Sequence, residues 1–143
     1  MFSGTYTPKL DEKGRLFLPA KFRDETKEGL VITRGQEHAL DIRTQADFDV
    51  FAEKFQNASQ TDARLRAYGR MLFALASEQV PDKQGRVTIP AHLREYAALN
   101  RELVVIGAST RVEIWDKQSW EQYLSASEDD FADIEEGVLP GGL

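Results

Sequence analysis

LDEKGRLFLPAKFRDE occupies residues 10–25, and PDKQGRVTIPAHLREY occupies residues 81–96. Aligned without a gap, the two stretches share Asp, Gly, Arg, Pro, Ala and Arg at the same six places. The chain therefore carries one uncommon sequence pattern twice, at an offset of 71 residues.

The likeness between the two stretches extends downstream over about half of the chain. LVITRG at 30–35 matches LVVIG at 103–107, and ALDIRT at 39–44 matches RVEIWD at 111–116. A match of this length at a nearly constant offset indicates an internal duplication rather than a chance repetition of one motif.

Each copy predicts the same order of short elements. DEKG in the first copy and DKQG in the second fit a tight turn, where Asp accepts a backbone hydrogen bond and Gly tolerates the exit geometry. The strand that follows alternates with period two, so Leu16 and Leu18 face the core while Arg15 and Phe17 face away. Pro19 suits the first turn of a short helix, and a β-hairpin follows.

A further helix is predicted after each hairpin, and another one between the two copies. The one after the first hairpin carries an apolar stripe at i, i+3, i+4 and i+7: Phe48, Phe51, Ala52 and Phe55. A helix between the copies places apolar side chains on one face: Leu65, Tyr68 and Leu72. Asp62 near the start of that helix suits the helix dipole. The second hairpin is followed by a shorter stripe: Trp120, Tyr123 and Leu124.

The size of each copy predicts how the two copies fold. A half of about 45 residues, made of short strands and one-turn helices, cannot bury enough apolar surface to stand alone. Two halves can cover one another across an approximate two-fold axis, so we expect a mainly β fold with short helices, of the α+β class, with intrachain pseudo-two-fold symmetry. The expected divisions are a first domain at 5–47, a helical connector at 48–75, a second domain at 76–119 and a helix end with an acidic tail at 120–143.

Charge is distributed unevenly along the chain. The net charge is −6, but residues 124–143 hold six acidic residues and no Lys or Arg, so residues 1–123 carry 18 residues of each sign. We interpret the tail from Ser125 onward as largely disordered, because it is acidic and has no counterpart in the repeat. Residues 9–27 hold six basic residues against four acidic ones, a small local surplus that suits a polyanionic partner.

Other features of the composition limit the cellular compartment that we expect and the kinds of chemistry that the chain can carry. The chain has no cysteine, which excludes disulfides, zinc ribbons and thiol catalysis and favours a reducing cytoplasm. No apolar run approaches the ~20 residues that span a bilayer, and the N-terminus lacks a signal-peptide pattern. We therefore expect a cytoplasmic protein that does not engage the membrane.

Two arginines stand out as candidate ligands for a polyanion. Arg15 and Arg86 each follow a tight turn directly and point away from their own core, on related surfaces of the two halves. A rigidly held guanidinium matches phosphate or guanine in bidentate geometry. The alternative is that each Arg pairs with the Asp four positions earlier and only locks the turn. Both roles can hold together.

LDEKGRLFLPAKFR and DKQGRVTIPAHLR closely resemble the MraZ family of bacterial transcriptional regulators. The Asp-x-x-x-Arg signature of that family falls at Asp11 and Arg15 and again at Asp82 and Arg86, and the resemblance covers roughly residues 1–124. It implies two SpoVT-AbrB domains of the swapped-hairpin β-barrel class. It further implies a nucleoid-associated, ring-like homo-oligomer that binds repeated double-stranded DNA elements upstream of the cell-division and cell-wall gene cluster.

The resemblance and the local charge together give a set of expected DNA contacts: Arg15, Arg86, Lys13, Lys9, Lys83 and Arg23. Four residues are expected to support the two turns: Asp11, Gly14, Asp82 and Gly85. We expect the first copy to contribute more contacts, because it is the more basic copy. Phe17 stands where the second copy has Thr88, and we expect a neighbouring subunit or the other half to cover it rather than a base to stack on it.

Two other classes of function are disfavoured. An enzyme is disfavoured because the chain has only His38 and His92, no Cys, and no phosphate-binding glycine loop. DEKGRL lacks the alternating oxygen ligands of a calcium loop, so we expect no metal, no cofactor, no catalytic residue and no small-molecule substrate. An antitoxin or other interaction module is the second alternative, disfavoured by two complete copies and a short tail.

Overall fold

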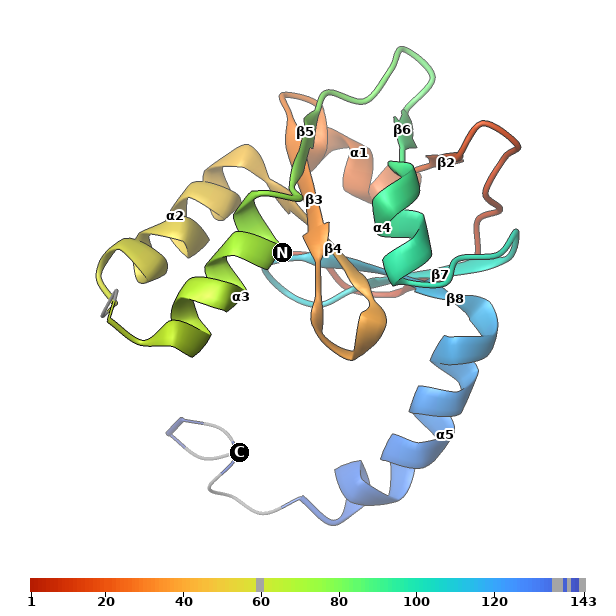
Figure 1. The fold of residues 1–143 in the computed structure, drawn as a ribbon. Helices are drawn as coiled ribbons and strands as arrows, with labels where there is room; N and C mark the ends of the chain where they lie inside the picture. The colour runs from red at the N-terminus through yellow and green to blue at the C-terminus, as the bar shows by residue number, and fades with distance from the viewer. Residues whose placement is uncertain (59–60, 135–137, 139, 142–143) are drawn as a thin grey trace.

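The computed structural model describes residues 1–58, 61–134, 138 and 140–141, and places five α-helices and eight strands among them (Figure 1). The strands are β1 (Thr5–Tyr6), β2 (Arg15–Phe17), β3 (Leu30–Arg34), β4 (Leu40–Thr44), β5 (Ser77–Gln79), β6 (Arg86–Thr88), β7 (Leu103–Gly107) and β8 (Val112–Asp116). The helices are α1 (Ala20–Thr26), α2 (Gln45–Gln56), α3 (Ala63–Phe73), α4 (Ala91–Tyr96) and α5 (Lys117–Ala132), with a 3₁₀ turn at Gln36–His38. This mixed α and β content with antiparallel sheets confirms the predicted α+β class.

The strands of the two copies pair with one another rather than within each copy alone. Six strands form an antiparallel sheet in the order β1-β7-β8-β4-β3-β5, and β2 pairs with β6 in a separate two-stranded ladder. Exchanging each strand for its counterpart in the other copy leaves the order of the large sheet unchanged. The first copy therefore ends its sheet on a strand of the second copy, and the second on one of the first.

The sheet differs from the expectation of a closed β-barrel. Among the described residues, β1 and β5 form two open edges of the large sheet. The physical reason is that β2 and β6 hydrogen-bond to each other instead of bridging those edges. No helix in the described part of the chain is long and apolar enough to cross a bilayer.

The main core lies between the large sheet and the short elements of both copies. Leu18 and Phe22 of the first copy, and Ile89 and Leu93 of the second, are fully buried in it. These are equivalent positions of the repeat, so each copy contributes the same apolar face. Neither face is covered without the other, as the small size of each half predicts.

The connector helices begin where local capping predicts. The Asp62 carboxylate accepts a hydrogen bond from the backbone N–H of Arg64 at 2.8 Å, and Thr44 caps α2 through the N–H of Asp47 at 3.0 Å. Figure 1 shows α2 and α3 as an adjacent pair at one side of the sheet. Phe55 of α2 and Phe73 of α3 are joined by an edge-to-face ring contact of 5.2 Å.

The last helix is longer than the sequence pattern predicted. Residues from Ser125 onward were expected to be largely disordered, whereas α5 continues to Ala132. The Asp116 side chain caps its first turn, and the apolar positions begun at Trp120 and Tyr123 continue at helical spacing to Phe131. Of the tail beyond, residues 135–137, 139 and 142–143 lie outside the described residues.

Candidate nucleic-acid interface

The first repeated turn holds Arg15 through its preceding carboxylate. The Asp11 Oδ1 atom accepts hydrogen bonds from the backbone N–H groups of Lys13 at 2.9 Å and Arg15 at 2.8 Å. Its Oδ2 atom accepts one from Arg15 Nε at 2.8 Å. Gly14 closes the turn by donating to the Asp11 carbonyl, with a φ of +76° that favours glycine. One side chain thus fixes both the turn and the guanidinium.

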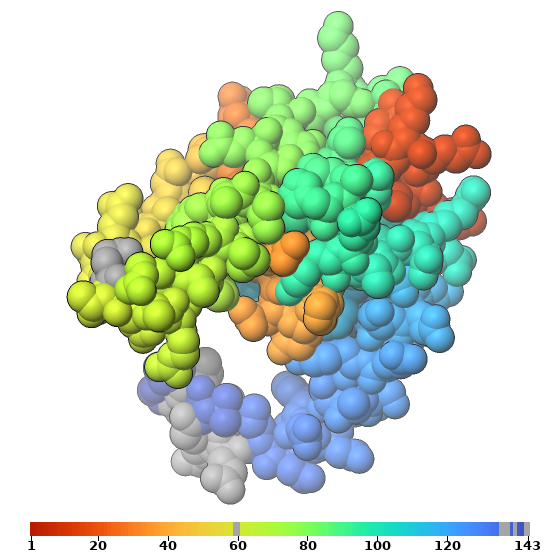
Figure 2. All heavy atoms as spheres, viewed as in Figure 1, coloured from red at the N-terminus to blue at the C-terminus, as the bar shows by residue number. Residues whose placement is uncertain are grey.

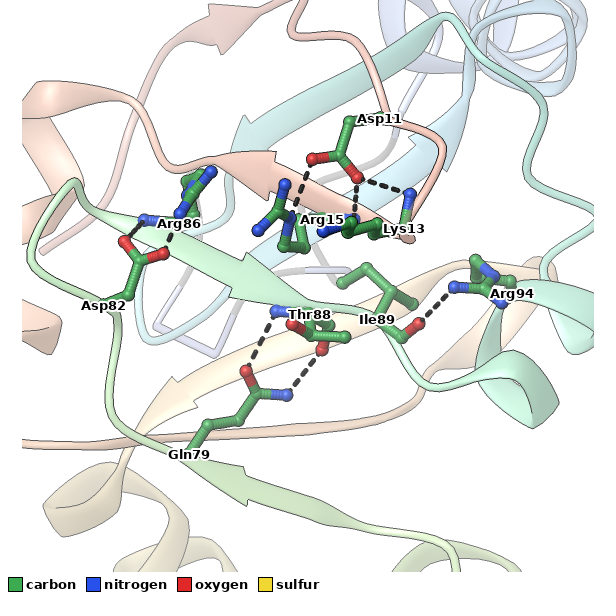
Figure 3. Close-up of polar contacts among 9 residues, drawn as sticks. All are labelled: Asp11, Lys13, Arg15, Gln79, Asp82, Arg86, Thr88, Ile89 and Arg94. Atoms are coloured by element: carbon green, nitrogen blue, oxygen red, sulfur yellow. Dashed lines mark hydrogen bonds and ion pairs between the residues drawn. The ribbon is translucent and has the colours of Figure 1, made fainter.

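The second turn repeats this geometry almost atom for atom. The Asp82 Oδ1 atom accepts from the N–H groups of Gln84 and Arg86, both at 2.9 Å, and Arg86 Nε donates to Asp82 Oδ2 at 2.7 Å. Gly85 has a φ of +79°. Figure 3 shows the two Asp–Arg pairs on the adjacent strands of the ladder.

Both carboxylates stay ionised beside their arginines. The pKa of Asp11 lies below its usual value, chiefly because the backbone N–H of Arg15 donates to it. The pKa of Asp82 is lowered for the equivalent reason, with Arg86 as the donor. The Asp carboxylates therefore act as rigid anchors for the two guanidinium groups at neutral pH.

The ladder places both arginines on one surface. Its register pairs Arg15 with Thr88, Leu16 with Val87, and Phe17 with Arg86. Leu16 and Val87 are buried, and alternation along a strand then puts the other two pairs on the outer face. The sequence pattern predicted related surfaces on separate halves, whereas the structure gives a single two-stranded face.

The arginines are only partly used by their own turns. Their side chains remain 27% and 24% exposed, for Arg15 and Arg86 respectively. Within the described part of the chain, the Nη atoms of both have no hydrogen-bond partner. Phe17 on the same face is 50% exposed, so the other half does not fully cover it. The outer face of the ladder therefore presents the guanidinium groups of Arg15 and Arg86 beside the exposed ring of Phe17.

Each turn is supported by an arginine from the opposite copy. Arg23 Nε donates to the Leu18 carbonyl at 2.8 Å, and its side chain lies 2.7 Å from where a Cβ would stand on Gly85. Arg94 Nη1 donates to the Ile89 carbonyl at 2.9 Å, and it occupies the place of a Cβ on Gly14. The glycines therefore serve close packing between copies as well as turn geometry.

Further backbone bonds tie the turns to the opposite copy. Leu18 N–H donates to the Gly85 carbonyl at 3.1 Å, and Ile89 N–H donates to the Gly14 carbonyl at 2.7 Å. The Gln79 side chain of β5 also clamps Thr88, accepting from its N–H at 3.0 Å and donating to its carbonyl at 2.6 Å (Figure 3). The ladder is thus held rigidly at both ends.

The other residues expected to contact DNA lie in different parts of the structure. Lys13 and Lys83 are exposed on the two turns beside the ladder. Lys83 and Arg23 also line one depression of about 360 Å³. Lys9 lies outside the ladder, in a backbone bridge to Glu102. Arg23 is partly buried and engaged with backbone, a position that fits support of the turn better than the direct DNA contact predicted from the sequence.

Arg94 and Gln79 were missed by the sequence analysis as members of this site. Arg94 is the repeat counterpart of Arg23, so the shared Arg of the two stretches was the available signal. Gln79 gives no such signal, because the equivalent position in the first copy is occupied by Pro8. Its role follows only from the position of β5, which pairs with β3 and brings the Gln79 side chain to Thr88 of β6.

The sequence of this chain matches those of known proteins. A family model described as "MraZ protein, putative antitoxin-like" matches residues 1–71 and again residues 72–139. The chain belongs to the MraZ family. The two matches divide it near the end of α3 and so reproduce the internal duplication.

Curated members of the MraZ family align with nearly the whole chain. A transcriptional regulator MraZ from Salinispora arenicola (strain CNS-205) is 63% identical over 141 residues, which cover 99% of each chain. The protein of the same name from Salinispora tropica is also 63% identical, with the same coverage. The one from Thermobifida fusca (strain YX) is 54% identical over 143 residues, the full length of both chains. The similarity therefore includes both turns and α5.

Proposed function

We propose that this chain is a transcriptional regulator that binds double-stranded DNA sequence-specifically through the outer face of the β2–β6 ladder. The observation that carries the proposal is the pair of arginines, Arg15 and Arg86, on one face. Each is fixed at Nε by a carboxylate, and its Nη donors have no partner among the residues that the structure describes. The names of the curated MraZ relatives, all transcriptional regulators, support the same function.

The shape and chemistry of this face suit DNA. The major groove admits a two-stranded β-ribbon, and a fixed Arg fork matches guanine or a phosphate in bidentate geometry. Lys13 and Lys83 on the flanking turns would contact the backbone and so set the orientation of the ladder. Arg23 and Arg94 would hold the turns from beneath.

Oligomerisation is part of the proposal. Residues 1–123 have balanced charge, so a single subunit offers few cations and releases few counterions. Several subunits acting on repeated DNA elements would gain effective concentration at each further site. The resemblance to the MraZ family supports a ring-like homo-oligomer, associated with the nucleoid, on repeats upstream of the division and cell-wall gene cluster.

We also assign the two copies to the swapped-hairpin class of SpoVT-AbrB domains. Support comes from the exchange of edge strands between copies and from the cross-copy bonds of Leu18 and Ile89. A non-enzymatic role agrees with the family assignment. An antitoxin role remains the alternative, favoured only by the words "putative antitoxin-like" in the description of the family model.

DNA binding by Arg15 can be tested with a duplex footprinted from upstream of the gene for this chain. We expect Arg15→Ala to weaken binding to that duplex by more than about 1 kcal/mol, because a fork that reads a base or a fixed phosphate is lost. Binding by the wild type should also fall steeply as salt rises. Fluorescence anisotropy with a labelled duplex measures both effects.

Two further variants separate geometry from charge. Arg15→Lys keeps the charge but not the planar fork, and we expect it to bind the footprinted duplex more weakly than the wild type. Lys54→Ala removes one exposed positive charge from α2, away from the ladder, and should bind as the wild type does. Unchanged affinity for Arg15→Ala would exclude the proposed role of this face.

A further inference from the structure

An apolar groove of about 710 Å³ lies between α2 and α3, away from the β2–β6 ladder. Its lining includes Phe48, Ala52, Phe55, Leu65 and Phe73. Phe55 stacks on Tyr68 at a ring-centroid distance of 5.5 Å and meets Phe73 edge-on at 5.2 Å, so the aromatic floor is preformed. Within the described residues this groove is open, and open apolar grooves of this kind mark docking sites.

A second apolar surface lies on α5. Its members recur at helical spacing, with the small Ser127 between the last two: Trp120, Tyr123, Leu124 and Phe131. The first two are used within the chain, because Trp115 contacts the rings of Trp120 at 5.3 Å and Tyr123 at 4.9 Å. Farther along, Leu124 is exposed and Phe131 is 76% exposed. The base of the helix is therefore anchored, whereas its second half presents an uncovered stripe.

The two surfaces carry opposite charge. α3 contains three arginines and no acidic residue: Arg64, Arg66 and Arg70. Beyond Tyr123, α5 contains three acidic residues and no Lys or Arg: Glu128, Asp129 and Asp130. Arg66 and Arg70 line the groove itself. A helix that placed its apolar stripe in the groove would therefore bring carboxylates near these guanidinium groups.

The geometry favours a second copy over the same chain as the source of that helix. Asp116 caps α5, and the contacts of Trp115 fix the direction in which the helix leaves the sheet. Figure 1 shows α5 running away from the body, and Figure 2 shows open space between the atoms of α3 and those of α5. The groove and the stripe thus lie at separate places on one molecule.

We infer that the second half of α5 docks in the α2–α3 groove of a second copy of this chain, with Phe131 inserted among the rings of the groove. The inference rests on the self-assembly included in the proposed function and names the surfaces that make it. Because the two surfaces differ, the contact is heterologous: each copy donates one helix and receives another. Such contacts form closed rings when the rotation between subunits closes.

Two variants of the full chain each remove one side of this contact. Phe131→Glu places a charge at an exposed position of α5, where it should not disturb the fold. Gly69→Phe directs a ring into the groove from α3, and its Cβ would meet Phe55 and Phe73 at ordinary contact distances of 3.9 Å. Gln122→Glu on α5 and Gly69→Ala on α3 are the matched controls.

Sedimentation velocity without DNA measures the outcome. We expect the wild type and both controls to assemble, and Phe131→Glu and Gly69→Phe each to sediment as monomers with wild-type circular dichroism. Mixing the two monomeric variants should then give a 1:1 dimer, because one partner retains an intact groove and the other an intact helix. That complementation is specific to a heterologous contact between these two surfaces.

The possible results are distinguishable from one another. If the wild type assembles and either Phe131→Glu or Gly69→Phe still assembles, the inference is wrong while the self-assembly of the proposed function stands. If the variants separate but do not form a dimer on mixing, the contact is not between α5 and the groove. A wild type that is monomeric, whether because α5 folds back or because another protein fills the groove, overturns both the inference and the proposed self-assembly.

Discussion

At the residue scale, the geometry of the Asp–Arg pair is compatible with both roles considered for the repeated arginines, locking the turn and contacting DNA. Asp11 uses one oxygen for the turn and the other for Arg15 Nε, so locking the turn and presenting the guanidinium are one arrangement. The remaining Nη donors keep their hydrogen-bonding capacity for a partner.

A second group of charges lies in the large sheet, on β4 and β8, away from the two Asp–Arg turns. Asp41 is buried, with its oxygens 3.5 Å from Arg43 Nη1 and 3.4 Å from Arg111 Nε. Glu113 is also close, bonded to Arg111 at 2.8 Å. Burial raises the pKa of Asp41 from 3.8 to about 6, against the opposing effect of the two arginines.

The raised pKa of Asp41 predicts a pH dependence of stability. The folded state binds the proton more tightly than the unfolded state, so stability falls as pH rises from about 4 through about 6. We expect the free energy of unfolding to rise by about 1 kcal/mol from pH 7 to pH 5. Asp41→Asn should remove most of that rise. Urea unfolding at the two pH values measures it.

The control for this prediction comes from the turn carboxylates. Asp11 and Asp82 have lowered pKa values, so their contributions are lost only at pH values below the window of Asp41. Equal changes between pH 7 and pH 5 in the wild type and in Asp41→Asn would show that Asp41 is not the titrating group.

At the element scale, the repeat predicted most strands and helices but not their partners. The turn residues, the period-two alternation and the proline predicted β2 and α1, and the predicted ends of both elements lie within one or two residues of those in the structure. The β2–β6 pairing and the packing of Arg94 against Gly14 join residues of different copies. Such contacts depend on how the copies dock, which local patterns do not encode.

The last helix, α5, is an element for which composition gave the wrong prediction. Composition predicted disorder for the residues after Leu124, because this segment holds six acidic residues and no Lys or Arg and has no counterpart in the repeat. The structure instead continues the helix that Asp116 caps, and Phe131 extends its apolar stripe seven residues beyond Leu124. Periodicity was therefore a better guide than charge, and the docking inferred above would cover the exposed stripe with a second copy.

The turn of the first copy allows a test of the contact between copies. Gly14→Ala requires a strained φ of +76° and also places a Cβ on Arg94 Nη1, so we expect a loss of about 1–3 kcal/mol in unfolding free energy. Gly69→Ala on α3 meets only ordinary contacts and should stabilise by up to about 1 kcal/mol. Urea unfolding compares the two variants, and a Gly14→Ala variant as stable as the wild type would contradict this view of Gly14.

At the scale of the whole molecule, the duplication joins one short strand of each copy into a single surface. Equivalent strands of the two copies meet in the β2–β6 ladder, and their apolar sides share one core beneath it. The arginines are therefore fixed relative to each other by the fold of a single chain. Assembly through other surfaces would then repeat this face along DNA without altering it.

The double variant Arg15→Ala/Arg86→Ala tests this shared face most directly. Its affinity for the footprinted duplex and for a scrambled duplex of equal length should be measured by anisotropy, with circular dichroism and sedimentation as checks on fold and assembly. We expect specific binding to fall by about 25-fold or more, since each lost fork costs at least about 1 kcal/mol, and to approach binding to the scrambled duplex. Specific binding within twofold of the wild type, in a folded and assembled variant, would contradict a DNA-reading role for the two arginines.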